Sequence, residues 1–275
     1  MKILFLESIS GRYDELKYAT CVAKKYASEL RKSGHEVIEI ERPSPKQANE
    51  AIKKYKPDIV WWVGHGSKDK ATLEKIKLWI STTHNLQILK DTIAVAHACF
   101  TGLQLGPKAV KIGATAYLGY TKELWFQWCN DPEYYNCACS GKNPYGIRPE
   151  VWKKILISSH VGTLTFIKSL AKGKDYKTAF DDSIKAFEKY EDELRKIKPS
   201  TQSEASIIRV QLWALDNNKE AQVLYIRKTE EKAEVQTGNK IRPLKSLMIF
   251  GLMSLPVIGI AYVGGESHAE KLPNI

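Results

Sequence analysis

The pattern of apolar and polar residues in the first 120 positions switches repeatedly between strand and helix. Apolar runs at 3–6, 58–63, 92–96 and 114–119 are typical of strands buried on both faces of a parallel sheet. Residues 36–41 alternate between apolar and polar, which predicts another strand. Apolar residues recur at helical spacing over 16–30 and 48–55. Strands that alternate with helices predict an α/β fold with a mainly parallel central sheet.

The second half of the chain has a different pattern. Residues 121–150 are rich in aromatic residues, cysteine, proline and glycine, and we interpret them as a long loop. Helices are predicted over 151–171 and over 175–197, where Asp175 is a suitable N-cap. Residues 207–215 and 223–226 are predicted to be late strands joined by a turn at 216–218.

A stretch without charged residues lies near the C-terminus. Residues 246–265 form a run of 20 uncharged residues, and a helix of that length is about 30 Å long, enough to cross a bilayer core. Lys240, Arg242 and Lys245 precede the run and only Lys271 follows it. The positive-inside rule therefore predicts a single-pass C-terminal membrane helix with the N-terminal part in the cytoplasm. A buried core helix or a docked apolar tail is the alternative.

These boundaries give a domain at 1–227, a charged juxtamembrane linker at 228–245, the membrane helix at 246–265 and a short tail at 266–275. The 275 residues are 43% hydrophobic and 27% charged, a globular composition that excludes a disordered chain. The net charge is +11, but the lysines are scattered among glutamates. We therefore interpret them as solvated surface and expect no nucleic-acid partner.

The five cysteines are too few and too unevenly spaced for a disulfide scaffold. Cys129, Cys137 and Cys139 lie close together, and with His160 they could bind zinc, although their spacing does not match paired Cys-x2-Cys knuckles. A disulfide and free thiols are the other interpretations. We predict neither a metal nor a cofactor.

The candidate chemistry lies where two apolar strands end. The strand at 58–63 is followed by Gly64, His65 and Gly66, and the strand at 92–96 leads to Cys99. In a parallel sheet, ligands bind beyond the carboxyl ends of the strands. An imidazole can accept the proton of a thiol or stabilise its thiolate, and glycines leave N–H groups free to face an oxyanion. A buried core cysteine beside an unrelated histidine is the plainer alternative.

A His-Gly after one apolar strand and an Ala-Cys after the next resemble the caspase-like cysteine peptidases. This clan contains caspases, legumains, gingipains, clostripain-like enzymes and CHAT domains, and the chain looks nearest to the gingipain and CHAT types. The Cys-x-x-Gly turn that ends at Gly102 resembles theirs. Three further segments are similar: the small-residue strand at 113–120, the helix pair at 166–187 and a final strand and turn at 209–218. The resemblance therefore spans about 1–227.

The resemblance implies a three-layer α/β/α sandwich and a cysteine endopeptidase that acts on a peptide or protein through a thioester acyl-enzyme. His65 would be the base or ion-pair partner and Cys99 the nucleophile. The backbone N–H groups of Gly66 and Cys99 would form the oxyanion hole.

Tyr120 and Trp125 are candidates for a substrate pocket, although this aromatic stretch could equally bind a partner or form a local core. One residue departs from the family pattern. Caspases and legumains carry Gln or Glu before the Ala-Cys pair, and this chain has His97. We expect its side chain to point to the opposite face from the other neighbours of Cys99, and either to be structural or to support the catalytic residues without reacting itself. A catalytically silent or partner-activated interaction module of the same fold, and an unrelated flavodoxin-like binding domain, are the alternative functions.

Overall fold

The computed structural model describes residues 1–8, 16–74, 77–126, 146–227 and 234–237. Its elements are, in chain order, β1 (Lys2–Glu7), α1 (Leu16–Lys32), β2 (Glu36–Glu41), α2 (Pro45–Tyr55), β3 (Ile59–Val63), β4 (Lys70–Leu73), β5 (Lys77–Ser81), the 3-10 helix η1 (Leu86–Leu89), β6 (Ile93–His97), α3 (Leu105–Lys111), β7 (Ala116–Tyr120), α5 (Pro149–Ser158), α6 (Val161–Ala171), α7 (Tyr176–Arg195), α8 (Gln202–Ala221), β8 (Gln222–Ile226) and β9 (Glu234–Thr237).

Seven strands form one sheet in the order β2-β1-β3-β6-β7-β8-β9. The first five are mutually parallel, whereas β8 runs antiparallel to β7 and β9 antiparallel to β8. Strands β4 and β5 pair as a separate antiparallel hairpin. The prediction of an α/β fold with a mainly parallel sheet is therefore confirmed.

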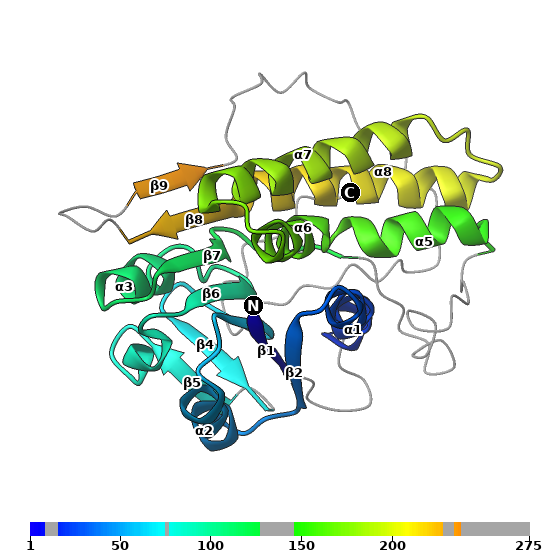
Figure 1. Ribbon diagram of the computed structural model, residues 1–275. Helices are drawn as coiled ribbons and strands as arrows, with labels where there is room; N and C mark the ends of the chain where they lie inside the picture. The colour runs from blue at the N-terminus through cyan, green and yellow to red at the C-terminus, as the bar shows by residue number, and fades with distance from the viewer. Residues whose placement is uncertain (9–15, 75–76, 127–145, 228–233, 238–275) are drawn as a thin grey trace.

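Helices cover both faces of the sheet (Figure 1). One hydrophobic cluster joins the sheet to α1, α6 and α7, and a second joins the opposite face to α2, α3 and the β4–β5 hairpin. A third cluster holds α5, α7 and α8 together. The central strand β3 has all five residues buried, with Trp61 stacked on Phe5 at a ring distance of 4.1 Å on one face. Burial on both faces explains its continuous apolar sequence.

Two predictions about secondary structure in the second half of the chain are wrong. Residues 151–171 form parts of two helices, α5 and α6, which are separated at Ser159 and His160. The hydroxyl of Ser159 accepts from the amide of Gln211, and the imidazole of His160 meets that of His97. Residues 207–215, predicted as a strand, and the predicted turn at 216–218 all belong to α8. Thr201 caps that helix by accepting from the N–H of Glu204.

The fold also extends past the predicted boundary at residue 227, because β9 lies inside the range assigned to the linker and pairs with β8. The candidate membrane helix at 246–265, the tail at 266–275 and the cysteines at 129, 137 and 139 lie outside the described residues. Among the helices that are described, none combines the length and apolar character needed to cross a bilayer.

Candidate functional site

The predicted histidine and cysteine lie at one edge of the sheet. Strands β3 and β6 are adjacent and parallel, with Val63 paired to His97. His65 and Cys99 each follow two residues beyond this pair, and the N–H of Gly64 still donates to the carbonyl of His97 at 3.3 Å. The expectation that the two strands are neighbours is confirmed.

Backbone hydrogen bonds fix both strand ends. The carbonyl of His65 accepts from the N–H of Thr72 at 3.1 Å, so the chain beyond β3 returns immediately along β4. The carbonyl of Lys68 accepts from the N–H groups of Gln104 and Leu105 at 2.9 Å each. The turn after the histidine is therefore tied to the start of α3, the helix that follows the cysteine.

Close packing at Gly66 leaves no room for a side chain. A Cβ atom there would lie 2.5 Å from Cγ2 of Thr101 and 2.7 Å from the carbonyl oxygen of Cys99. The backbone turns sharply after the cysteine, because Phe100 adopts φ 59°, a conformation rare for a bulky residue. Within the described part of the chain, the N–H of Gly66 donates no hydrogen bond to a backbone carbonyl. It is therefore available to an incoming acceptor, as an oxyanion hole requires.

The thiol of Cys99 is buried, with no exposed surface. The N–H of Leu124 donates to its sulfur at 3.3 Å. Burial raises the pKa of the Cys99 thiol to about 12, and the nearby charge of Glu123 adds to the effect. The group is therefore a neutral thiol at physiological pH.

His65 is half-buried and does not contact the thiol through a hydrogen bond. Within the described residues, its imidazole makes no hydrogen bond or ion pair with any side chain or backbone group. The structure thus brings His65 and Cys99 to neighbouring strand ends without joining their side chains. A catalytic pair would require the thiol to become accessible to the imidazole.

His97 differs from the expectation, because it lies on the same face of the sheet as Cys99. Side chains two residues apart on a strand share a face, and both residues face α6. His97 Nδ1 meets Thr163 Oγ1 at 3.1 Å, and His97 Nε2 meets His160 Nδ1 at 2.8 Å. Burial lowers the pKa of His97 to about 4 and lowers that of His160 well below its usual range. Both imidazoles are therefore neutral at pH 7.

The two candidates for a substrate pocket have different surroundings. Tyr120 is fully buried, and its hydroxyl bonds to Thr163 at 2.6 Å and to the amide of Gln222 at 3.2 Å. Its ring belongs to the interior and lines no open pocket here. Trp125 is partly exposed and packs edge-on against Trp213 at a ring distance of 4.8 Å. Half of Trp213 is exposed, so this pair forms an aromatic surface beside the site.

Sequence reasoning missed the buried pair of His97 and His160, as well as the role of residues 121–126 over the cysteine. The two histidines are 63 positions apart, and nothing in the sequence pairs them. The run of Ser158, Ser159 and His160 inside an apolar helix pattern was the available signal, because polar residues in a core need partners from other elements.

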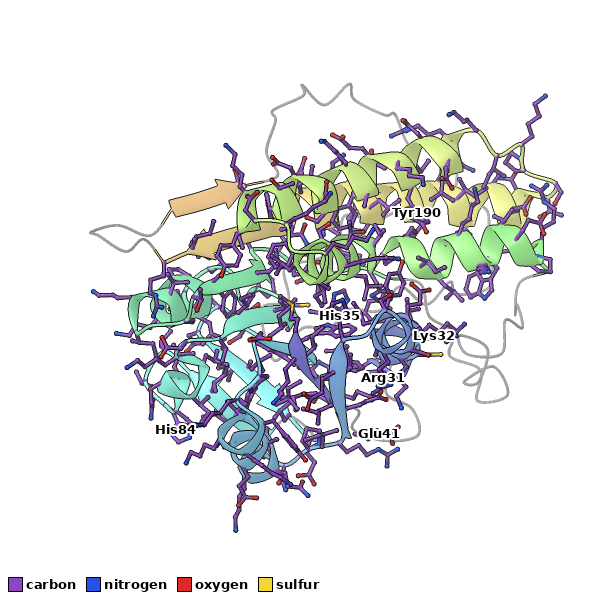
Figure 2. All side chains as sticks on the ribbon, in the orientation of Figure 1. Arg31, Lys32, His35, Glu41, His84 and Tyr190 are labelled. Atoms are coloured by element: carbon purple, nitrogen blue, oxygen red, sulfur yellow. The ribbon has the colours of Figure 1, made fainter. Side chains whose placement is uncertain are left out.

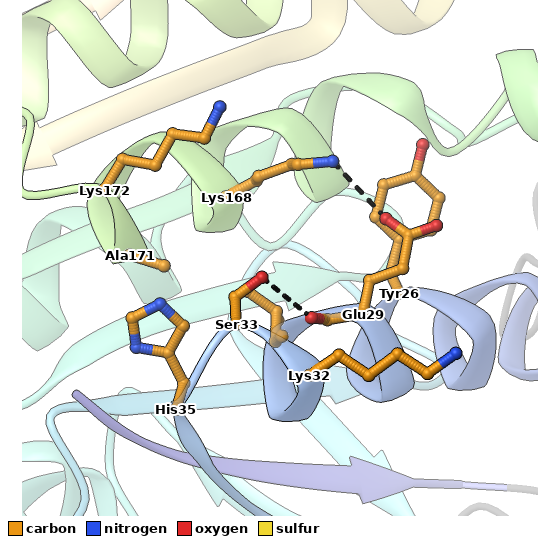
Figure 3. A pocket seen from close by; sticks show the side chains of 9 residues that line it. Tyr26, Glu29, Lys32, Ser33, His35, Lys168, Ala171 and Lys172 are labelled. Atoms are coloured by element: carbon orange, nitrogen blue, oxygen red, sulfur yellow. Dashed lines mark hydrogen bonds and ion pairs between the residues drawn. The ribbon is translucent and has the colours of Figure 1, made fainter.

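Other clusters lie away from the strand ends. Figure 2 shows His35 near α1 and His84 near α2. A cavity of about 290 Å³ lies where α1 and α6 end, at the opposite edge of the sheet, and includes Tyr26, Glu29, Lys168 and Lys172 (Figure 3). In this cavity the Lys168 ammonium pairs with Glu29 at 3.3 Å.

Three carboxylates near the end of β1, those of Glu7, Glu39 and Glu41, lie within 4.8 Å of one another. The ammonium of Lys24 lies among them, 3.2 Å from Glu7 and 3.7 Å from Glu39, and also pairs with Glu41. This ammonium supplies the positive charge that a metal ion would otherwise bring. The group is an ion-pair cluster, and we assign no metal to it.

Neither a protein-family model nor a curated protein matches this chain. The function is therefore inferred from the residues at the strand ends and their surroundings.

Proposed function

We propose that the chain is a caspase-like cysteine endopeptidase that uses His65 and Cys99. One observation carries the proposal: the adjacent parallel strands β3 and β6 are in register at Val63 and His97, and each continues to one member of the pair two residues later. The carboxyl edge of a parallel sheet is where such folds bind ligands. The close approach of Gly66 to Cys99 supports the same assignment.

The reaction needs no cofactor. Transfer of the Cys99 proton to His65 would create a thiolate, which attacks the carbonyl carbon of the scissile peptide bond. The N–H groups of Gly66 and Cys99 would stabilise the oxyanion. The C–N bond then breaks, the amine leaves with the proton held by His65, and a thioester remains. Water, deprotonated by the same imidazole, hydrolyses the thioester and restores the thiol.

The proposal includes the location of the enzyme. The uncharged run at 246–265 would anchor the chain to a membrane, and the positive charges before it favour a cytoplasmic catalytic domain. The direct measurement is partition of the full chain between membrane and soluble fractions after carbonate washing. Recovery of the chain in the soluble fraction would contradict the anchor without affecting the peptidase.

A second function is favoured by the state of the cysteine. A fully buried thiol with a pKa of about 12 suits a catalytically silent or partner-activated interaction module of the same fold. The aromatic surface of Trp125 and Trp213 would then be a candidate contact with the partner, because exposed tryptophans are enriched at binding sites.

Cleavage of a fluorogenic peptide library separates these functions. The peptidase predicts that the full chain cleaves peptides once its Cys99 thiol is accessible, and that cleavage is lost in both Cys99→Ala and His65→Ala. Lys108→Ala, on the surface of α3, is the control that should keep activity. No cleavage under any condition that exposes the thiol would favour the interaction module.

A further inference from the structure

Residues 121–126, which we call the strap, follow β7 directly and cover Cys99. The N–H of Leu124 donates to the Cys99 sulfur at 3.3 Å, and the carbonyl of Lys122 accepts from the N–H of Phe100 at 3.1 Å. Leu124 and Phe126 are each only 3% exposed and pack in the same hydrophobic cluster as the cysteine. The strap therefore touches both the nucleophile candidate and the residue after it.

The C-terminal turn of α8 holds the strap at successive positions. The carbonyl of Ala221 accepts from the N–H of Thr121 at 2.8 Å, and the side-chain amide of Asn217 donates to the carbonyl of Glu123 at 2.8 Å. An ion pair between Lys122 and Glu220, at 2.8 Å, is a further contact between the strap and α8. Because this ion pair is solvent-exposed, it adds little.

Asn218 makes the most specific contact with the strap. Its carbonyl oxygen accepts from the N–H of Trp125 at 2.9 Å, and its amide nitrogen donates to the carbonyl of Trp125 at 2.7 Å. Asn218 is fully buried, so both bonds are shielded from water and the backbone of Trp125 is satisfied on both sides. This side chain acts on the strap in the way a neighbouring strand would.

We infer that the strap is an autoinhibitory cover and that Asn218 is the latch that keeps it closed. The inference rests on the proposed peptidase function. A peptide carbonyl carbon must reach the sulfur of Cys99 and His65 must reach its proton, and both approaches are closed while the sulfur has no exposed surface. Opening the strap removes Leu124 from the sulfur and leaves the remaining sheet and helices in place. Asn218 is thus a positioning residue, and it touches no substrate.

The reactivity of Cys99 toward iodoacetamide, followed by peptide mapping in the full chain, measures the cover directly. In the wild type we expect Cys99 to react at least about 100-fold more slowly than in the unfolded chain, because local opening limits the reaction. Asn218→Ala removes both hydrogen bonds to the strap, together with a longer one of 3.4 Å to the carbonyl of Ser159. It should raise the rate about tenfold or more. Asn217→Ala, which removes one contact from a less buried site, should raise it by a smaller factor.

The matched control is Gln211→Ala, on the same helix. Gln211 is also fully buried, and its amide donates to the hydroxyls of Ser158 and Ser159 at 2.8 Å and 2.7 Å. Within the part of the chain that the structure describes, its side chain makes no hydrogen bond with the strap. A general loss of stability would therefore speed alkylation in this variant too, whereas release of the strap would not. Low concentrations of urea should leave the faster alkylation of Asn218→Ala unchanged, since local opening exposes little surface.

Two results would overturn the inference. One is a wild-type Cys99 that reacts as fast as in the unfolded chain. The other is equal acceleration by Asn218→Ala and Gln211→Ala, which would mean that Cys99 is reached by global unfolding. If Asn218→Ala fails to fold, the alkylation rate of Cys99 in Asn217→Ala tests the latch instead. An unchanged rate in that variant would contradict the latch.

Peptide cleavage separates the latch from the peptidase. Faster alkylation without any cleavage would keep the cover and reject the peptidase. Cleavage by a wild type whose Cys99 is freely alkylated would reject the cover and keep the peptidase.

Discussion

Acid should destabilise this protein through the buried pair of His97 and His160. Burial lowers the pKa of His97 from 6.5 to about 4, so the unfolded chain binds a proton at a pH where the folded chain does not. Stability is therefore unaffected above pH 6.5 and falls as the pH drops toward 4. The full difference corresponds to about 3 kcal/mol, of which about 2 kcal/mol is lost between pH 7 and pH 5. His160 adds a loss of the same sign, because its pKa is lowered too.

The assay is chemical denaturation of the wild type and His97→Asn at pH 7, 6 and 5. Asparagine keeps a polar group near Thr163 but removes the titrating imidazole. The variant should lose about 2 kcal/mol less than the wild type over this interval, whatever its stability at pH 7. His84→Asn, at an exposed histidine near α2 (Figure 2), is the control and should keep the wild-type slope.

An NMR titration of the imidazole carbons provides a second check. A His97 resonance that titrates near pH 6.5 in the folded protein would refute the reasoning, since it would mean that water or a charged group stabilises the imidazolium. Equal pH slopes in the wild type and His97→Asn would refute it as well.

Three further predictions concern packing and charge. Gly162→Ala should lower the free energy of unfolding by about 1–3 kcal/mol in a urea titration, because its Cβ would lie 2.2 Å from the ring of Phe187; an unchanged midpoint would contradict this packing. Arg148 holds the pKa of Glu204 at about 2, so stability from this carboxylate is present above pH 4.5 and lost as the pH falls toward 2. Glu204→Gln should therefore cost about 1–2 kcal/mol at pH 7 and less at pH 3, and a pH-independent cost would contradict the ion pair. Burial raises the pKa of Glu7 to about 8, so the contribution of this carboxyl to stability should fall from pH 5 to pH 8, opposite in sign to that of the histidines; Glu7→Gln should become more stable relative to the wild type over that range, and a constant difference in denaturation midpoints would count against it.

The parallel core of the fold was predictable because its signals are local. The five all-apolar or alternating segments became β1, β2, β3, β6 and β7, since burial on both faces demands a run of apolar residues. Helix α7 begins after its predicted N-cap, Asp175, which accepts from the N–H of Thr178. The β4–β5 hairpin was not predicted, because its strands have only four and five residues and show too short a pattern.

Helix α8 shows why other parts of the fold could not be predicted from the sequence. Ile207, Ile208 and Leu215 suggest a strand when taken alone, but they lie on one buried face together with Gln211 and Asn218. Polar residues on a buried face hide the helical period, and their reason to be there is the contact with Ser159 and Trp125. The candidate site also depends on contacts that the local sequence does not reveal. His65 and Cys99 follow strands that could be predicted as neighbours, but the strap over Cys99 depends on contacts about 93 positions apart in the chain.

Peptide cleavage by a chain with an accessible cysteine tests the central claim most directly. The experiment compares the full chain carrying Asn218→Ala with the same variant that also carries Cys99→Ala or His65→Ala, on a mixed fluorogenic peptide library. Our account predicts cleavage in the first protein, its loss in both others, and a thioester on Cys99 trapped by acid quench and mass spectrometry. A folded Asn218→Ala protein whose Cys99 is readily alkylated but which cleaves nothing, or cleavage that survives Cys99→Ala, would contradict the account.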